Sequence, residues 1–169
     1  LGNSYDFYGI RPYYKGDSIR NIDWKAFGRT EKIYTRLFTE QKQMNITVLL
    51  DSSKSMDFNK SNKWNMAKMC AMGISYITLK ENNILNMYAF NEEVDLNLQG
   101  MNSKNIFYEI VKKINDINPN KKTNFNRIIS STSNNRGLIF IITDLLSDNI
   151  ESFLKESANK YERVVVIHI

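Results

Sequence analysis

The chain has 169 residues, a formal net charge of +5 and an apolar content that fits one globular domain. Its lysines are scattered rather than clustered, so no nucleic-acid binding is expected, and no run approaches the ~20 apolar residues needed to cross a bilayer. Cys70 is the only cysteine, which excludes disulfides and cysteine zinc sites within one chain. His168 is the only histidine and lies in a strand-like run, so a histidine metal centre or a serine–histidine hydrolase is hard to build.

The first 51 residues change in character along their length. Residues 1–32 combine the turn-forming pairs Arg11-Pro12 and Lys15-Gly16 with many charges, so we expect loops and short turns there. Residues 33–41 alternate as a strand does, and we expect them to form a hairpin with the next strand through a turn near residues 42–43. The β-branched and aliphatic run 45–51 predicts a buried parallel strand.

Helices and strands alternate in the rest of the chain. A broad apolar face that includes Trp64, Met69 and Ile77 predicts a helix over residues 63–80. Residues 84–90 predict a strand, and residues 94–98 an edge strand after a turn. Three further helices are expected, over residues 103–117, 123–133 and 148–160, the last starting with a capping box of Asp148 and Glu151. Strands are predicted over residues 137–143 and 164–169.

This alternation predicts an α/β fold. We expect a doubly wound, mostly parallel sheet of the Rossmann type, covered on both faces, with one antiparallel edge strand. The predicted organisation is an N-terminal extension, residues 1–44, packed on a domain formed by residues 45–169. The chain begins without methionine and stops inside an apolar run, so we expect a fragment of a longer protein.

Oxygen-bearing side chains follow the first buried strand. Asp51, Ser53 and Ser55 are spaced i, i+2 and i+4 at the carboxyl end of the strand, where open α/β sheets bind ligands. Oxygen ligands suit a hard cation such as Mg²⁺ better than zinc. The alternative is a helix N-cap cluster, because serine and aspartate are favoured at helix starts.

The motif resembles the metal-ion-dependent adhesion site of von Willebrand factor A-like domains. That site also needs a threonine on a later loop and an aspartate after a later strand, and Thr123 and Asp144 stand at those positions. Alone, Thr123 would be an ordinary N-cap and Asp144 a turn residue; the combination favours the metal site. The resemblance implies that Mg²⁺ (or Mn²⁺ or Ca²⁺) is bound, with Asp144 acting partly through water. A protein partner's Asp or Glu would complete the coordination shell.

The N-terminal third is similar to a bacterial family known as domain of unknown function fifty-eight. The similarity rests on Arg11-Pro12-Tyr13, Gly16-Asp17, Arg20-Asn21-Ile22-Asp23-Trp24, Arg29 and Glu40. It implies that membrane helices outside this chain anchor the full-length protein, with this domain facing the cytoplasm. It also implies an adaptor or co-chaperone role with a MoxR-type AAA+ ATPase. The last strand and helix of an A-like domain are expected beyond residue 169, so the domain would be truncated.

Five residues of the N-terminal third invite two interpretations. Arginine and tryptophan can bind phosphates and stack on bases, but nothing pairs these side chains for catalysis. We therefore expect a structural network of salt bridges and packing that ties this segment to the sheet. Its members are Arg20, Asp23, Trp24, Arg29 and Glu40.

Two other classes of function stay open. A Mg²⁺-dependent phosphatase-like enzyme would place a nucleophilic Asp51 after a strand, but it would want a second acid where Ser53 stands, and no Walker-type glycine-rich loop exists. Nucleic-acid binding through net basicity would lose affinity steeply with salt. The prediction we prefer is a metal-dependent protein–protein interaction module that is not an enzyme.

Overall fold

The computed structural model describes residues 4–41, 43–60, 62–133, 136–147 and 149–169. The chain divides into two compact units, residues 1–42 and residues 43–169, which we call the N-terminal unit and the sheet unit.

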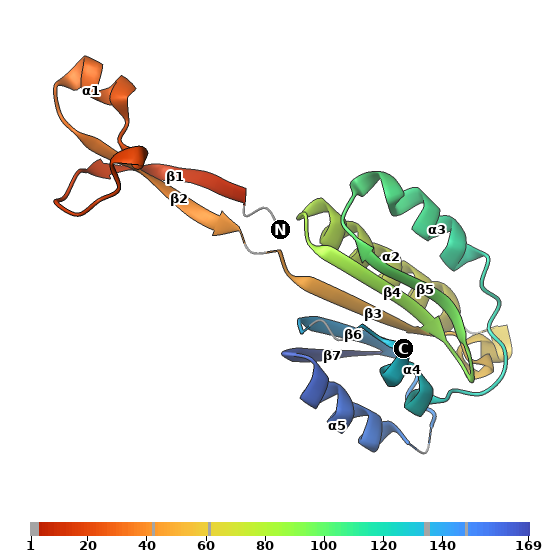
Figure 1. Ribbon diagram of the computed structural model, residues 1–169. Helices are drawn as coiled ribbons and strands as arrows, with labels where there is room; N and C mark the ends of the chain where they lie inside the picture. Colours follow the sequence, from red (N-terminus) through yellow and green to blue (C-terminus); the bar gives the residue numbers. More distant parts are fainter. Residues whose placement is uncertain (1–3, 42, 61, 134–135, 148) are drawn as a thin grey trace. The chain divides into compact units, whose positions relative to one another are not determined.

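The N-terminal unit is a two-stranded antiparallel sheet with an insertion. Strand β1 (Ser4–Pro12) pairs with β2 (Tyr34–Gln41), and the register shifts between Phe7 and Gly9. The chain between the strands forms a short 3₁₀ turn (Ile19–Asn21) and helix α1 (Trp24–Thr30) (Figure 1). Helix α1 begins where Asp23 accepts hydrogen bonds from the amides of Lys25 and Ala26, which is the usual chemistry of an N-cap.

Two predictions for this region are wrong. Residues 1–32 are not only loops and turns, because they contain β1 and α1. The strand at 33–41 does not form a hairpin with the strand at 45–51; β2 pairs with β1 instead. The adjacent position of two strands in sequence favoured the hairpin, but the true partner of β2 lies more than twenty residues upstream.

The sheet unit contains a five-stranded sheet in the order β5-β4-β3-β6-β7. All neighbouring strands are parallel except β5, which runs antiparallel to β4 at one edge. The strands are β3 (Asn45–Asp51), β4 (Ile84–Phe90), β5 (Val94–Met101), β6 (Leu138–Thr143) and β7 (Arg163–His168). The predicted α/β class and the antiparallel edge strand are confirmed.

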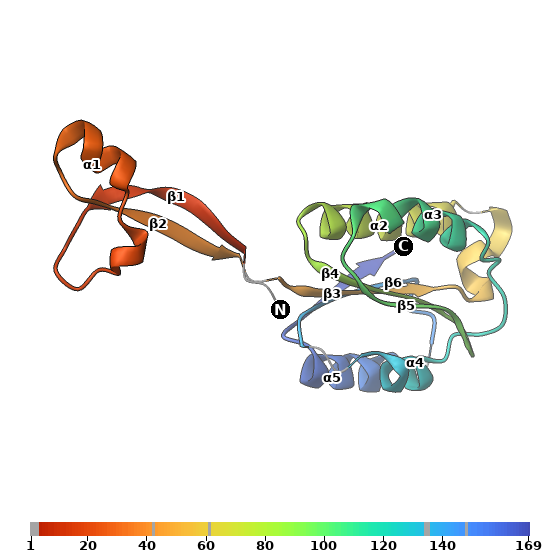
Figure 2. The same cartoon turned by 45° about the horizontal axis from the view of Figure 1, so that its top comes forward.

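Two layers of helices cover the sheet. Figure 2 shows α2 (Lys63–Lys80) and α3 (Phe107–Asn115) on one face, and α4 (Phe125–Ser131) and α5 (Ile150–Lys160) on the other. Short 3₁₀ segments, Lys54–Lys60 and Lys104–Ile106, follow β3 and precede α3. The helices match their predicted places to within a few residues at each end. Asp148 lies outside the described residues, and the N-cap of α5 is Asn149, whose side chain makes no capping bond.

Alternate residues of the central strand β3 face the two helix layers. Val48 and Leu50 belong to the core with α2 and α3, whereas Leu49 belongs to the core with α4 and α5. Burying a side chain of this kind contributes roughly 1.5–3 kcal/mol, so both faces of β3 require apolar residues. On α2 the buried face is narrower than predicted, because Met69 and Ile77 are more than half exposed.

The topology creates a crevice at the carboxyl edge of the sheet. From β3 the chain passes to β4 on one side, and later to β6 on the other, so the strand order reverses beside β3. Gly137 permits the close approach of β6 at its start, since a Cβ atom there would collide with the backbone oxygen of Asn45. Asp51 and Thr143 end β3 and β6 at this crevice.

Candidate metal centre

Asp51 is the buried centre of the site. Its side chain is inaccessible to solvent, and its Oδ1 accepts a hydrogen bond from the Ser53 amide (2.9 Å). Its Oδ2 accepts one from Thr143 Oγ1 (2.7 Å) and a longer one from Thr123 Oγ1 (3.2 Å). Three parts of the chain therefore converge on one carboxylate, from the ends of β3 and β6 and the loop before α4.

The two serines of the motif lie beside each other in the turn after β3. Ser53 is buried, Ser55 is half-buried, and their hydroxyl oxygens are 3.0 Å apart. The backbone holds this turn against the loop that carries Thr123. The amide of Lys54 donates to the carbonyl of Lys121 (2.9 Å), and the amide of Asn120 donates to the carbonyl of Ser52 (3.0 Å).

Asp144 follows β6 and is also buried, with 4% of its surface exposed. Its Oδ1 accepts a hydrogen bond from the Leu146 amide (3.2 Å), whereas its Oδ2 is buried without a hydrogen bond. The nearest cation is the ammonium of Lys63 at the start of α2, 3.6 Å from Oδ2. This oxygen has one weak electrostatic contact in place of a hydrogen bond, which is unusual for a buried carboxylate.

The electrostatics of the site favour a cation. Burial raises the pKa of Asp51 above its ordinary value of 3.8, and the charge of Asp144 raises it further. Hydrogen bonds from Thr143 and Ser53 act in the opposite direction without cancelling the effect of burial. An ionised Asp51 is therefore costly in the folded protein unless a positive charge lies close by.

A pocket of about 840 Å³ opens at the turn after β3. Ser53, Ser55 and Thr123 line it from the predicted motif. The remaining lining residues are Lys54, Lys121, Lys122 and the turn 145–147 after β6. Lys121 and Leu145 both have positive φ angles of 58°, a strained conformation for these residue types that often marks functional loops.

Sequence comparison places the chain in a family. Residues 9–169 match the family described as "Protein of unknown function DUF58". The chain belongs to this family. No curated protein matches the sequence.

Comparison of this DUF58 chain with solved structures shows its fold. It resembles an aerotolerance-related membrane protein from Bacteroides fragilis (TM-score 0.54, 17% identity, 74% of this chain and 67% of that one). It also resembles a von Willebrand factor type A protein from Catenulispora acidiphila (0.50, 15%, 79% and 35%). A third is proximal thread matrix protein 1 from the mussel byssus, with a zinc-occupied MIDAS motif (0.52, 17%, 75% and 38%). The chain spans about two thirds of the first protein and little more than a third of the others. At these identities the likeness shows a von Willebrand factor A-like fold.

The donor set of the DUF58 chain fits a hard cation. Among the described residues, no three His, Cys, Asp or Glu side chains cluster as metal ligands, so any ion here would depend on hydroxyl groups. Two buried carboxylates and three hydroxyls are oxygen donors of the kind that Mg²⁺ prefers. Asp144 Oδ2 is buried without a hydrogen bond, and burial raises the pKa of Asp51. A nearby positive charge would stabilise both carboxylates in their ionised forms.

Part of the site escaped the sequence analysis. Thr143 donates the shortest hydrogen bond to Asp51, and it lies across from Asp51 because Leu50 pairs with Ile142. The register of β3 and β6 could have revealed it. A polar network beside the site was also missed: Ser52 Oγ and Asn91 Nδ2 both donate to Asp95 Oδ2, at 2.6 and 2.7 Å. No sequence signal points to Asp95, which lies on the edge strand β5.

The residues predicted to form a structural network in the N-terminal third have different contacts from one another. Asp23 caps α1, and Trp24 is 59% exposed with its ring edge-to-face with Phe27. Neither Arg20 nor Arg29 has an ion pair among the described residues, and the side chain of Glu40 lies outside them. Their role as a network tying this segment to the sheet stays a prediction.

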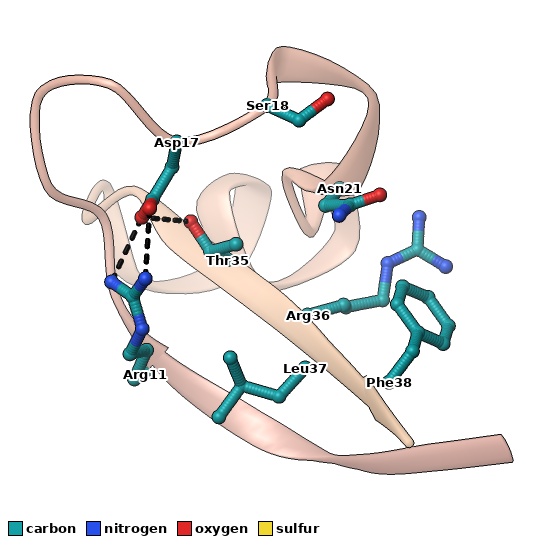
Figure 3. A pocket seen from close by; sticks show the side chains of 8 residues that line it. All are labelled: Arg11, Asp17, Ser18, Asn21, Thr35, Arg36, Leu37 and Phe38. Atoms are coloured by element: carbon teal, nitrogen blue, oxygen red, sulfur yellow. Dashed lines mark hydrogen bonds and ion pairs between the residues drawn. The ribbon is translucent and has the colours of Figure 1, made fainter. Parts of the chain in front are cut away.

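A different polar cluster organises the N-terminal unit. Arg11 and Asp17 form a bidentate ion pair with both distances at 2.8 Å, and Thr35 Oγ1 donates to Asp17 (3.1 Å) (Figure 3). The hydrogen bond from Arg11 is the largest reason that the pKa of Asp17 falls to about 2. The cluster borders a pocket of about 660 Å³ that Arg36 and Phe38 also line. This pair has the geometry of a structural clamp between β1 and the loop after it.

In the described part of the chain, none of the helices is both long and apolar enough to span a membrane.

Proposed function

We propose that this DUF58 domain is a metal-dependent module that binds another protein. The observation that carries the proposal is that Ser53 and Thr123, which line one pocket, both donate hydrogen bonds to the buried carboxylate of Asp51. The buried Oδ2 of Asp144 has no hydrogen bond. The residues that would hold the ion are Asp51, Ser53, Ser55, Thr123 and Asp144. Mg²⁺ is the expected ion, with Mn²⁺ or Ca²⁺ as alternatives. The zinc-occupied motif of the mussel protein supports a metal role for this fold.

The chemistry follows from the charges of the donors. A bound divalent cation supplies a Lewis-acidic position that attracts an incoming carboxylate. Ser53, Ser55 and Thr123 contribute neutral oxygens, so Asp51 and Asp144 are the sources of negative charge. Such a donor set leaves the ion incompletely neutralised, and we propose that an Asp or Glu of the protein partner supplies the remaining ligand.

We propose binding rather than catalysis for this site. Asp51 is fully buried and is not among the lining residues of the pocket, so a phosphate ester in the pocket would not reach its carboxylate oxygens. Ser53 stands where a phosphatase of the aspartate type would carry its second acid. The alternative, a Mg²⁺-dependent phosphatase-like enzyme, predicts turnover of a phosphate ester at saturating Mg²⁺, whereas a binding module predicts none.

The experiment is a metal titration of three proteins by calorimetry. Wild type should bind Mg²⁺ or Mn²⁺ at one site, Asp51→Ala should not, and both should give the same circular dichroism spectrum. Asp116→Ala is the matched control, because Asp116 is an exposed aspartate at the end of α3. Equal binding by wild type and Asp51→Ala would refute the metal site. An assay with p-nitrophenyl phosphate on the same proteins tests the enzyme alternative.

We further propose the wider setting that the family resemblance implies. The full-length protein would be anchored in a membrane by segments outside this chain, with the domain in the cytoplasm, residues 1–44 as an extension packed on it, and a MoxR-type AAA+ ATPase as partner. The likeness to an aerotolerance-related membrane protein supports the membrane setting. Copurification of a tagged full-length protein with the ATPase in Mg²⁺, and its loss in EDTA, would test this proposal.

A further inference from the structure

The walls of the metal-site pocket carry an excess of positive charge. Lys54, Lys121 and Lys122 line it, and no acidic residue lines it within the described part of the chain. Lys121 is neutralised by Glu93, with its Nζ 2.7 Å from the carboxylate. Lys54 and Lys122 are exposed and have no ion pair within the described residues.

These lysines do not serve the metal. A cation held by Asp51 and Asp144 would be repelled by Lys54 and Lys122 on the pocket wall, so the lysines lower the affinity for a metal alone. They favour a ligand that brings negative charge to the mouth of the pocket. One carboxylate on the ion leaves two lysines without a partner, which argues for a ligand with several carboxylates.

The pocket also has an apolar side. Leu145 and Leu146 lie in the turn after β6, and Leu146 is 66% exposed although it lines the pocket. Among the described residues, no arginine lines the pocket, whereas sites that bind phosphate frequently use the bidentate guanidinium group. Exposed leucine beside lysine suits a peptide that carries acidic and apolar side chains together.

We infer that the partner of this pocket is an acidic protein segment, with one carboxylate for the metal, at least two more for Lys54 and Lys122, and an apolar residue for Leu146. This inference rests on the proposed function, because the first carboxylate needs the ion. The proposed function specifies only one Asp or Glu of the partner, whereas this inference specifies a segment with several acidic side chains and an apolar one.

The test compares two fluorescent ten-residue peptides by anisotropy in 5 mM MgCl₂. One holds a single Asp next to Leu in a Gly/Ser background, and the other adds three Glu residues. At 50 mM NaCl the wild type should bind the four-acid peptide about tenfold more tightly, a difference of about 1.4 kcal/mol supplied by two exposed ion pairs. Added salt should reduce this difference. In Lys54→Glu/Lys122→Glu the preference should vanish, while Mg²⁺ alone binds at least as tightly as in the wild type.

The matched control is Lys104→Glu/Lys112→Glu, which makes the same charge change at exposed lysines of the Lys104–Ile106 turn and α3, outside the pocket lining. It should keep the preference. The inference is overturned if Lys54→Glu/Lys122→Glu keeps it too, if the wild type binds neither peptide, or if a phosphoserine peptide binds more tightly than the four-acid one. If the four-acid peptide needs the two lysines but binds equally in EDTA, the acidic partner stands and the metal-dependent function fails.

Discussion

Replacing Asp51 with Asn separates the fold from metal binding. The substitution keeps the shape of the side chain but removes the charge whose burial raises the pKa of Asp51. An amide oxygen can still accept the Ser53 amide, and Thr143 can turn its hydroxyl to accept from the new NH₂ group. We therefore expect Asp51→Asn without metal to be at least as stable as the wild type.

Metal should then distinguish the two proteins. A ligand at one hundred times its dissociation constant stabilises the folded state by about 2.7 kcal/mol. For a chain of this length each kcal/mol raises Tm by about 2–4 °C, so saturating Mg²⁺ should raise the Tm of the wild type by about 5–11 °C. Asp51→Asn should show no shift. Scanning calorimetry in 10 mM MgCl₂ and in EDTA measures both, with Asp116→Asn as a control that should behave like the wild type.

The pH should change both the stability of the metal-free protein and the rise in Tm that Mg²⁺ causes. Because the folded pKa of Asp51 lies above 3.8, its ionised form destabilises the metal-free fold at neutral pH. That cost disappears as the pH falls through the raised pKa and is gone below 3.8. Metal binding needs the ionised form, so the Mg²⁺-dependent rise in Tm should shrink over the same range. A rise in Tm that is equal at pH 7 and pH 4, or equal in Asp51→Asn, would refute the reasoning.

Three other perturbations probe neighbouring groups. Lys63→Met removes the cation beside Asp144, so calorimetry should show Mg²⁺ binding at least about fivefold tighter, because this partly buried ion pair is worth no less than an exposed one. Asp95→Ala removes the acceptor shared by Ser52 and Asn91 and should weaken Mg²⁺ binding about 10–100-fold with an unchanged circular dichroism spectrum. The ionised Asp17 should stabilise the N-terminal unit fully above its ordinary pKa of 3.8, and this stabilisation should be lost as the pH falls through about 2. NMR signals of β1 and β2 should follow the loss in the wild type. They should not follow it in Asp17→Asn.

The predictability of the elements depended on how much of each is buried. Strands β3 and β6 have both faces covered, so their sequences are continuous apolar runs that the pattern identifies at once. In strand β1 the apolar side chains of Tyr8 and Ile10 are exposed, and the register shifts between Phe7 and Gly9. The alternation of apolar and polar residues that would predict a strand is therefore broken in this segment. Its partner β2 was found as a strand but paired wrongly, because pairing across an inserted helix leaves no local signal.

The order of residues along the chain was enough to propose the metal ligands, but not their neighbours. Asp51, Ser53 and Ser55 are close in sequence, and a resemblance to a known motif linked them with Thr123 and Asp144. Thr143 contacts Asp51 because β6 lies beside β3, and Asp95 contacts Ser52 from the edge strand β5. Both contacts can be foreseen only from the order of strands in the sheet.

Local charge explains more about this site than net charge does. The scattered lysines gave no indication of a binding surface, yet the fold places Lys54, Lys121 and Lys122 on the wall of one pocket and Lys63 beside the buried Asp144. Without metal, Lys63 provides part of the positive charge that Asp144 needs; with metal, the site would carry a local excess of positive charge. That excess makes the affinity for an acidic ligand and the affinity for the ion depend on each other. A metal titration repeated with the four-acid peptide present should therefore show tighter Mg²⁺ binding, and by the same factor that Mg²⁺ tightens the peptide.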